Sequence, residues 1–261
     1  MMNVWRRFFS APKLQATPFS GKIEIFSRHC IFSSISQHKK RFPNFTREAC
    51  YLNLLETLDP FQANLTFFLD LAKGPKKDHF LSQEKTHPVI EIEEGSEAGS
   101  FLRLLDYVSA LDLDPETILY FVEDDYIHRP YWLDVLSQGF QVPGADYVTL
   151  YDHRDKYFAY SNLTSQIFAT SLCHWRSTPS TTNTFATRFK TLLRDLSIHR
   201  KFSENRTISA DHDKFIHLQK KRGAILISSI PGWSTHAEPD FASPCIDWEI
   251  HLKNRSSYVS S

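Results

Sequence analysis

Short apolar runs recur along the first half of the chain and predict strands. Residues 22–26 alternate and include β-branched positions, and residues 64–70 and 89–92 form similar runs. The run at 118–122 holds five consecutive apolar or aromatic residues, which is typical of a strand buried on both faces. A further run at 145–151 predicts another strand.

Between these runs, apolar residues recur at helical spacing. Residues 46–58 begin with a Thr-Arg-Glu start signal and end before Asp59 and Pro60, which stop a helix. The loop at 93–100 opens a second helix, whose apolar face holds Phe101, Leu104, Leu105 and Val108. Further helices are predicted at 131–136, at 185–196 and from about residue 209.

The alternation of strands and helices sets the expected fold. It indicates an α/β domain with a mainly parallel central sheet and helices on both faces. In the second half, residues 165–176 predict a strand or hairpin and residues 224–227 a strand. Ligands of such sheets bind beyond the carboxyl ends of the strands, where Asp70, residues 95–100 and residues 123–125 fall.

Composition narrows the classes of function. The chain has 261 residues, 41% of them hydrophobic, enough for the core of one large α/β domain or two small ones. Basic and acidic residues number 30 each, so no nucleic-acid partner is expected, since such proteins favour a basic excess. The sequence contains no run of about 18 apolar residues, so no membrane span is predicted. The cysteines are widely spaced, which favours reduced thiols.

The start of the chain, residues 1–21, is predicted to be a loose leader. It combines Trp5, Arg6 and Arg7 with two phenylalanines but lacks the apolar segment of a signal peptide. Basic and aromatic residues together favour peripheral association with an anionic membrane surface, and a frayed start is the simpler alternative.

Three carboxylates follow the central apolar run directly. In an extended chain, Glu123 and Asp125 would project to one side and Asp124 to the other. Two converging carboxylates repel each other unless a cation or a proton lies between them, and a divalent ion is the natural occupant. The alternative is a helix N-terminus, since acids favour the first turn and residues 131–136 look helical.

Two loops are further candidates for ligand contact. Gly95 and Ser96 lie in a strand-to-helix junction whose backbone amides can hold phosphate oxygens, although a plain turn has the same composition. Residues 177–184 are rich in hydroxyl groups, which fits a recognition loop for a polyhydroxylated ligand or a turn before the next helix.

With these elements in order, residues 22–238 resemble the nucleotide-sugar-dependent glycosyltransferases of the GT-A fold, in the style of family 2-like members. The resemblance rests on the apolar strand that ends in Glu123-Asp124-Asp125, a DxD-like motif in ExD form, and on the segment 231–236. It implies a GT-A-like, Rossmann-like domain at 22–240, with a nucleotide-binding half at 22–151, an acceptor-binding half at 152–240 and a C-terminal tail at 241–261.

The resemblance also implies roles for individual residues. Asp125 would ligate Mn²⁺ or Mg²⁺, His236 would complete the metal shell, and Glu123 would reach the ribose or a metal-bound water. Asp211, or else Asp213, would be the general base of an inverting transferase, with a helix cap as the alternative. The remaining nucleotide contacts would come from Arg28, Asp70, Gly95, Ser96 and Asp124.

The implied reaction moves a sugar from a nucleotide-diphosphate-sugar donor to a carbohydrate or lipid-linked (glycolipid) acceptor. A cytoplasmic enzyme is expected, with attachment to a membrane surface as a further option. A second hypothesis is a metal-dependent phosphohydrolase or nucleotidyltransferase, which also uses clustered acids at strand ends. A third is a non-catalytic protein that keeps the fold.

Overall fold

The computed structural model describes residues 21–33, 36–160 and 162–252. The predicted leader therefore lies, except for Gly21, outside the described residues.

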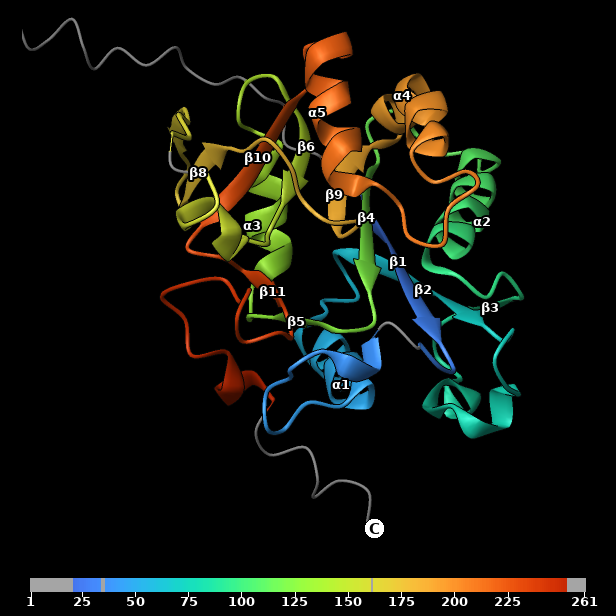
Figure 1. Ribbon diagram of the computed structural model, residues 1–261. Coiled ribbons are helices and arrows are strands. Elements are labelled where there is room, and N and C mark those ends of the chain that lie inside the picture. The colour runs from blue at the N-terminus through green and yellow to red at the C-terminus, as the bar shows by residue number, and fades with distance from the viewer. Residues whose placement is uncertain (1–20, 34–35, 161, 253–261) are drawn as a thin grey trace, which may run out of the picture.

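A nine-stranded sheet forms the centre of the molecule, in the order β3-β2-β1-β4-β9-β6-β10-β8-β7 (Figure 1). Its strands are β1 (Ile23–Cys30), β2 (Ala63–Asp70), β3 (Val89–Ile92), β4 (Ile118–Glu123), β6 (Ala145–Thr149), β7 (Ile167–Ala169), β8 (His174–Ser177), β9 (Phe185–Arg188) and β10 (Ile225–Ile230).

Seven of these strands share one direction, and among the described strands of this sheet only β8 and β9 run against them. The predicted α/β fold with a mainly parallel sheet is thus confirmed. Strand β4 lies near the middle, and its side chains alternate between two cores. Tyr120 and Val122 join the core on one face, whereas Leu119 and Phe121 join the core on the other.

Helices cover both faces of the sheet, as expected. One face packs against α1 (Arg47–Thr57) and α3 (Trp132–Gly139) through Leu54, Trp132 and Leu136. The other face packs against α2 (Glu97–Ser109), α4 (Phe189–Lys201) and α5 (Asp211–Arg222). The predicted apolar face of α2, made of Phe101, Leu104, Leu105 and Val108, is fully buried there.

A second, two-stranded sheet joins distant parts of the chain. Strand β5 (Tyr126–His128) pairs antiparallel with β11 (Ser234–His236), and His236 lies opposite Tyr126. The backbone N–H of Ala237 also donates to the carbonyl oxygen of Asp125, at 2.9 Å. This pairing brings His236 beside the acids that end β4.

One element contradicts the sequence prediction. A single helix is predicted over 185–196, but the structure has β9 first, inserted antiparallel between β4 and β6, and α4 only from Phe189. Phe185 and Ala186 are fully buried in the sheet. A short apolar run that is buried on all sides has the same composition in a strand as in a helix, so the pattern alone does not separate the two.

The acids are not the N-terminus of a helix either. Strand β4 ends at Glu123, Asp124 and Asp125 form a turn into β5, and α3 begins only at Trp132. The expected alternation of the three side chains is therefore wrong beyond Glu123, because a turn rather than an extended strand carries the last two.

Two segments outside the main elements also pack into the protein. The polar segment 73–88 forms two short 3₁₀ turns and buries Leu81 completely. Trp248 and Leu252, from the segment predicted as a tail, pack against Ala49 and Cys50 of α1. All four cysteines are thiols and not disulfides, as the sequence predicts.

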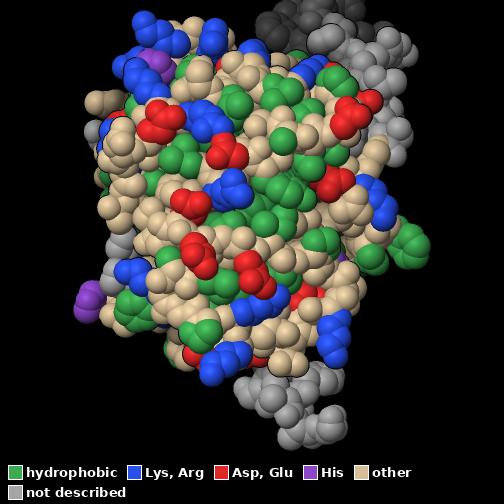
Figure 2. Space-filling model, turned by 90° about the vertical axis from the view of Figure 1, so that its right-hand side faces the viewer, with side chains coloured by type: hydrophobic (Ala, Val, Ile, Leu, Met, Phe, Trp, Pro, Cys, Tyr) green, Lys and Arg blue, Asp and Glu red, His purple; other side chains and the backbone are tan. Residues whose placement is uncertain are grey.

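The face that carries α2 and α4 mixes both signs of charge. Figure 2 shows acidic and basic side chains interspersed over this face, with apolar side chains between them. Among the described residues, no helix is long and apolar enough to cross a bilayer.

Candidate active site

A cavity of about 310 Å³ opens at the carboxyl ends of β1, β2 and β4. Residues 207–209, which precede α5, and Asp211, its first residue, line the opposite wall. The cavity is lined mainly by polar and charged residues, among them Arg28, Lys39, Arg47, Asp70, Lys73, Glu97, Glu123, Asp124, Asp125, Thr182, Asn183, Asp211 and His236. The expectation that Asp70, the Gly/Ser loop and the β4 acids meet at one edge of the sheet is therefore met.

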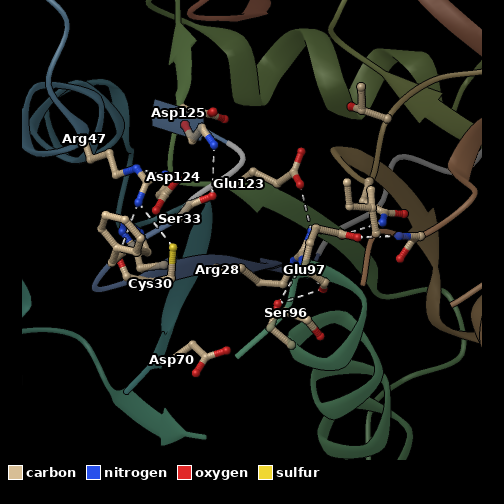
Figure 3. A pocket seen from close by; sticks show the side chains of 18 of the residues that line it. Arg28, Cys30, Ser33, Arg47, Asp70, Ser96, Glu97, Glu123, Asp124 and Asp125 are labelled. Atoms are coloured by element: carbon tan, nitrogen blue, oxygen red, sulfur yellow. Dashed lines mark hydrogen bonds and ion pairs between the residues drawn. The ribbon is translucent and has the colours of Figure 1, made fainter. Parts of the chain in front are cut away.

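Arg28 holds the Glu123 end of the cavity. It lies within β1, directly beside Glu123 in the strand register, because β1 extends beyond the predicted 22–26 to Cys30. Its Nη2 donates to Glu123 Oε1 at 3.1 Å and to Glu97 Oε1 at 3.0 Å, while Nη1 donates to Ser100 Oγ at 3.0 Å. Arg28, predicted as a nucleotide contact, thus already ties β4 to the first turn of α2 (Figure 3).

Glu97 extends this framework to the opposite wall. Its Oε1 also accepts from Asn183 Nδ2 at 2.8 Å, and its Oε2 accepts from the backbone N–H of Ser209 at 2.7 Å. Asn183 in turn accepts a hydrogen bond from the fully buried Lys214 of α5. One carboxylate therefore fixes the loop that leads into α5 relative to the sheet.

The other two acids have arginine partners of their own. Asp124 is buried and lies 3.4 Å from Nε of Arg47 in the first turn of α1, toward which it is directed in Figure 3. Asp125 Oδ2 accepts from Arg41 Nη2 at 2.8 Å and lies 2.8 Å from His236 Nε2. The end of β4 and the turn after it thus place three neighbouring carboxylates against three different guanidinium groups.

The surroundings give the three acids different pKa values. Burial, with the charges of Glu97 and Asp125 and against that of Arg28, raises the pKa of Glu123 to about 7. Burial likewise raises the pKa of Asp124 to about 6, although Arg47 opposes it. Burial acts the same way on Asp125, but the positive charges of His236 and Arg41 outweigh it and lower the pKa of Asp125.

His236 lies between two carboxylates. Its Nε2 faces Asp125, and its Nδ1 is 3.1 Å from Glu238 Oε1, which Lys39 Nζ also approaches at 2.5 Å. Burial opposes the charged imidazolium, but Asp125 and Glu238 raise the pKa of His236 to about 9. His236 is therefore protonated at neutral pH and serves as a cation toward Asp125.

The two residues predicted as metal ligands, Asp125 and His236, do lie side by side, but the oxygen of Asp125 that faces His236 also binds Arg41. The Oδ2 atom of Asp125 already accepts from Arg41 Nη2 and lies against His236 Nε2, at 2.8 Å each, so a cation at this oxygen would have to displace the guanidinium. Within the described ranges, no group of three or more His, Cys, Asp or Glu side chains could hold a metal ion. The arrangement does not fit a resident Mn²⁺ or Mg²⁺.

Asp70, Gly95 and Ser96 form the loop edge of the cavity. The Asp70 carboxylate accepts from the backbone N–H groups of Ala72, Glu94 and Gly95 at 2.8–3.2 Å, so it joins the loops that follow β2 and β3. Gly95 has φ +68°, which side chains rarely adopt. Ser96 caps α2, accepting from Gly99 N at 3.1 Å. All three line the cavity, as predicted, and their nucleotide contacts stay a prediction.

The structure separates the two candidate bases. Asp211 is the first residue of α5 and lines the cavity, and burial raises its pKa against the charge of Lys214. Asp213 is exposed and is not among the lining residues. Of the two, only Asp211 is in place to act on a bound ligand.

The hydroxyl-rich segment 177–184 is mostly buried rather than open to a ligand. Thr181 Oγ1 donates to Thr149 Oγ1 at 3.2 Å, and Thr184 Oγ1 accepts from the backbone N–H of Glu123 at 3.3 Å. Thr182 and Asn183 line the cavity. Thr181 and Thr184 thus hold the segment against the sheet, and its last part, Thr182 and Asn183, faces the site.

The sequence prediction missed five charged residues of the site: Lys39, Arg41, Arg47, Lys73 and Glu97. Arg47 stands in the Thr-Arg-Glu signal that predicts the start of α1, and Glu97 in the capped start of α2. Arg28 carried a usable signal, since an arginine within a buried strand requires a carboxylate nearby. No pattern in the sequence indicates that the segment with Lys39 and Arg41 lies against Asp125 and Glu238.

Comparison with known proteins adds little to this geometry. No protein-family model and no curated protein matches the chain. Among solved structures, it is similar to a CMP:2-keto-3-deoxy-manno-octonic acid synthetase complexed with CTP, at 13% identity and a TM-score of 0.46, over 84% of this chain and 95% of that one. Similarity at this level assigns no function to the chain.

Proposed function

We propose that the cavity binds a nucleotide-diphosphate sugar and that the protein transfers the sugar to a hydroxyl group of a carbohydrate or lipid-linked carbohydrate. The observation that carries the proposal is that Asp211 lines the same cavity as the acids that end β4. This cavity lies at the carboxyl ends of parallel strands. In this proposal residues 22–151 bind the nucleotide and residues 152–240 bind the acceptor.

Charge at the cavity supports a diphosphate ligand. Lys39, Arg47 and Lys73 all line it, and the N-terminal turn of α2, capped by Ser96, opens onto it. Backbone amides at a helix N-terminus and cationic side chains both stabilise phosphate oxygens. The N-terminal turn of α2 lies on the Asp70 and Gly95 side, where the nucleotide is proposed to bind, whereas Lys39 lies at the His236 end of the cavity and Arg47 beside Asp124.

The transfer requires a base for the acceptor hydroxyl. In an inverting transfer, the acceptor oxygen attacks C1 of the sugar, its proton passes to Asp211, and the bond between C1 and the diphosphate oxygen breaks. The electron pair of that bond leaves with the nucleoside diphosphate. A carboxylate whose pKa is raised by burial is a stronger base, which suits Asp211 to this step. Side-chain cations stabilise the charge on the leaving diphosphate.

Two variants of α5 test the role of Asp211. Asp211→Asn should lower kcat by roughly 100-fold or more, the usual contribution of a general base, while nucleoside diphosphate binding is retained. Asp213→Asn is the matched control on the same helix and should transfer sugar at the wild-type rate. Release of nucleoside diphosphate from sugar nucleotides measures the rate, and equal rates in the two variants would remove Asp211 from the reaction.

A panel of nucleoside diphosphates and triphosphates separates this proposal from nucleotidyl transfer. Thermal stabilisation by one nucleoside diphosphate, followed by turnover of its sugar conjugates, supports sugar transfer. Release of pyrophosphate from a nucleoside triphosphate and a sugar substrate would replace it with nucleotidyl transfer. Absence of any thermal shift would favour a non-catalytic protein. Cytoplasmic location and membrane-surface attachment stay predictions.

A further inference from the structure

Each acid at the end of β4 is paired with an arginine of the protein itself. Glu123 has Arg28, Asp124 has Arg47 and Asp125 has Arg41, at 3.1, 3.4 and 2.8 Å. A carboxylate cluster attracts a divalent ion because its charges are otherwise unbalanced. Asp124 and Asp125 each have a guanidinium partner that no other carboxylate shares in these contacts, so that cause is absent at the Asp125 end, whereas Glu123 shares Arg28 with Glu97.

The contact between Arg41 and Asp125 is part of a built arrangement. Arg41 Nη2 also lies 2.6 Å from Ser36 Oγ, and its guanidinium lies over the ring of Phe45, 4.5 Å from the centroid. Phe45 packs against the core formed by α1 and the C-terminal segment. The side chain is thus fixed from three directions, which distinguishes it from a mobile surface arginine.

The same oxygen serves Arg41 and His236. Asp125 Oδ2 lies 2.8 Å from each, so an ion at about 2.1 Å from that oxygen, as Mg²⁺ requires, would have to displace the guanidinium. Arg41 Nε and Nη1 are buried without an acceptor among the described residues, and Arg41 itself is not among the residues that line the cavity. Its guanidinium carries the kind of charge that attracts phosphate oxygens.

From these contacts we infer that Arg41 occupies, at Asp125, the place that a divalent cation takes in a DxD-type site, so that this protein binds the diphosphate of its donor without a metal. The inference rests on the proposed function for the identity of the ligand, but its statement about the cation does not. Ser36 and Lys39, from the same segment as Arg41, line the cavity and bring that segment to the ligand.

Direct measurement of Mn²⁺ binding, by electron paramagnetic resonance without nucleotide, tests the inference. The wild-type protein should bind no more Mn²⁺ than Asp125→Asn does. Arg41→Met keeps an unbranched chain over Phe45 but removes the charge, and it should bind Mn²⁺ at least about tenfold more tightly than wild type. The double variant with Asp125→Asn should lose that gain.

Two control variants keep the result interpretable. Lys40→Met removes the neighbouring charge, which pairs with Asp240 at the surface, and should behave as wild type. Arg41→Lys keeps the charge and should exclude Mn²⁺ even if Arg41→Met folds poorly. Asp125-dependent Mn²⁺ binding by the wild type would overturn the inference, and so would Mn²⁺ binding that is equally weak in wild type and in folded Arg41→Met.

Calorimetry with nucleoside diphosphates in the presence of EDTA completes the test. Binding by wild type that EDTA leaves unchanged, and that Arg41→Met weakens at least about tenfold, supports the inference. Binding that requires Mn²⁺ in the wild type overturns it. If no nucleoside diphosphate binds under any condition, the proposed function fails, whereas the Mn²⁺ measurements still decide the role of Arg41.

Discussion

The two ends of the acidic motif differ more than their separation of two residues suggests. Glu123 shares one guanidinium, that of Arg28, with a second carboxylate, and its pKa is raised to about 7. Asp125 has two cationic partners, Arg41 and His236, of which His236 is shared with Glu238, and the pKa of Asp125 is lowered. Burial acts in the same direction on both, so the ratio of cations to carboxylates decides the outcome.

The two ends are also built from different parts of the fold. Regular elements assemble the Glu123 end, since Arg28 lies in β1 and Glu97 in α2. Long-range pairing of β5 with β11 and the segment around Arg41 assemble the Asp125 end. Opposite pKa shifts in neighbouring carboxylates allow two chemical roles in one cavity. At neutral pH, Glu123 can carry a proton while Asp125 stays charged.

Removing the charge at each end should have unequal consequences for stability. Asp125→Asn leaves Arg41 and His236 without their shared carboxylate and should cost about 4 kcal/mol of unfolding free energy. Glu123→Gln replaces a group that is about half protonated at pH 7, and Arg28 keeps Glu97 as a partner, so the change should cost less than about 1 kcal/mol. Urea unfolding at pH 7 measures both, and equal costs would contradict the comparison.

The charge of His236 should appear as a pH dependence of stability. Its pKa is about 9 in the folded protein against an ordinary 6.5, so its contribution is fully present below pH 6.5 and is lost as the pH rises through 9. The loss should be on the order of 3 kcal/mol. His236→Gln should lack this loss, and the difference between the two unfolding curves from pH 6 to 10 isolates it. A constant difference would disprove the charge.

The stability of the Glu123 end should depend on Arg28, which pairs with both Glu97 and Glu123. Arg28→Met leaves Glu97 and Glu123 facing each other, and the cost should be about 2 kcal/mol because Glu123 can take up a proton in compensation. Arg200→Met is the matched control: Arg200 of α4 is one-third exposed and pairs with Asp106 of α2, so its loss should cost less than about 1 kcal/mol. Chemical denaturation measures both, and similar costs would show that the framework adds nothing.

The sequence predicts those features that local pattern determines. The burial of β4 on both faces, the capped start of α1 and the apolar face of α2 all follow from residues close together in the chain. The position of the acids at a strand end, and their meeting with Asp70 and Gly95, follows from the parallel sheet.

Features that depend on distant partners could not be predicted in the same way. The sequence does not predict β9, because its apolar residues fit a helix equally well, and only its pairing with β4 and β6 identifies it as a strand. Arg41 meets Asp125 across 84 residues of sequence, and no pattern around either residue indicates the contact. The sequence places three acids at one terminus, but their charge balance is set by arginines from other elements.

Crystals of the wild-type protein soaked with a nucleoside diphosphate and Mn²⁺ would test the central claim most directly, with diffraction data collected at the manganese absorption edge. We expect the diphosphate in the cavity beside Lys39, Arg47 and Lys73, with Arg41 still on Asp125 and no anomalous peak near His236. A manganese peak between Asp125 and His236, or a nucleotide bound elsewhere on the protein, would contradict the account.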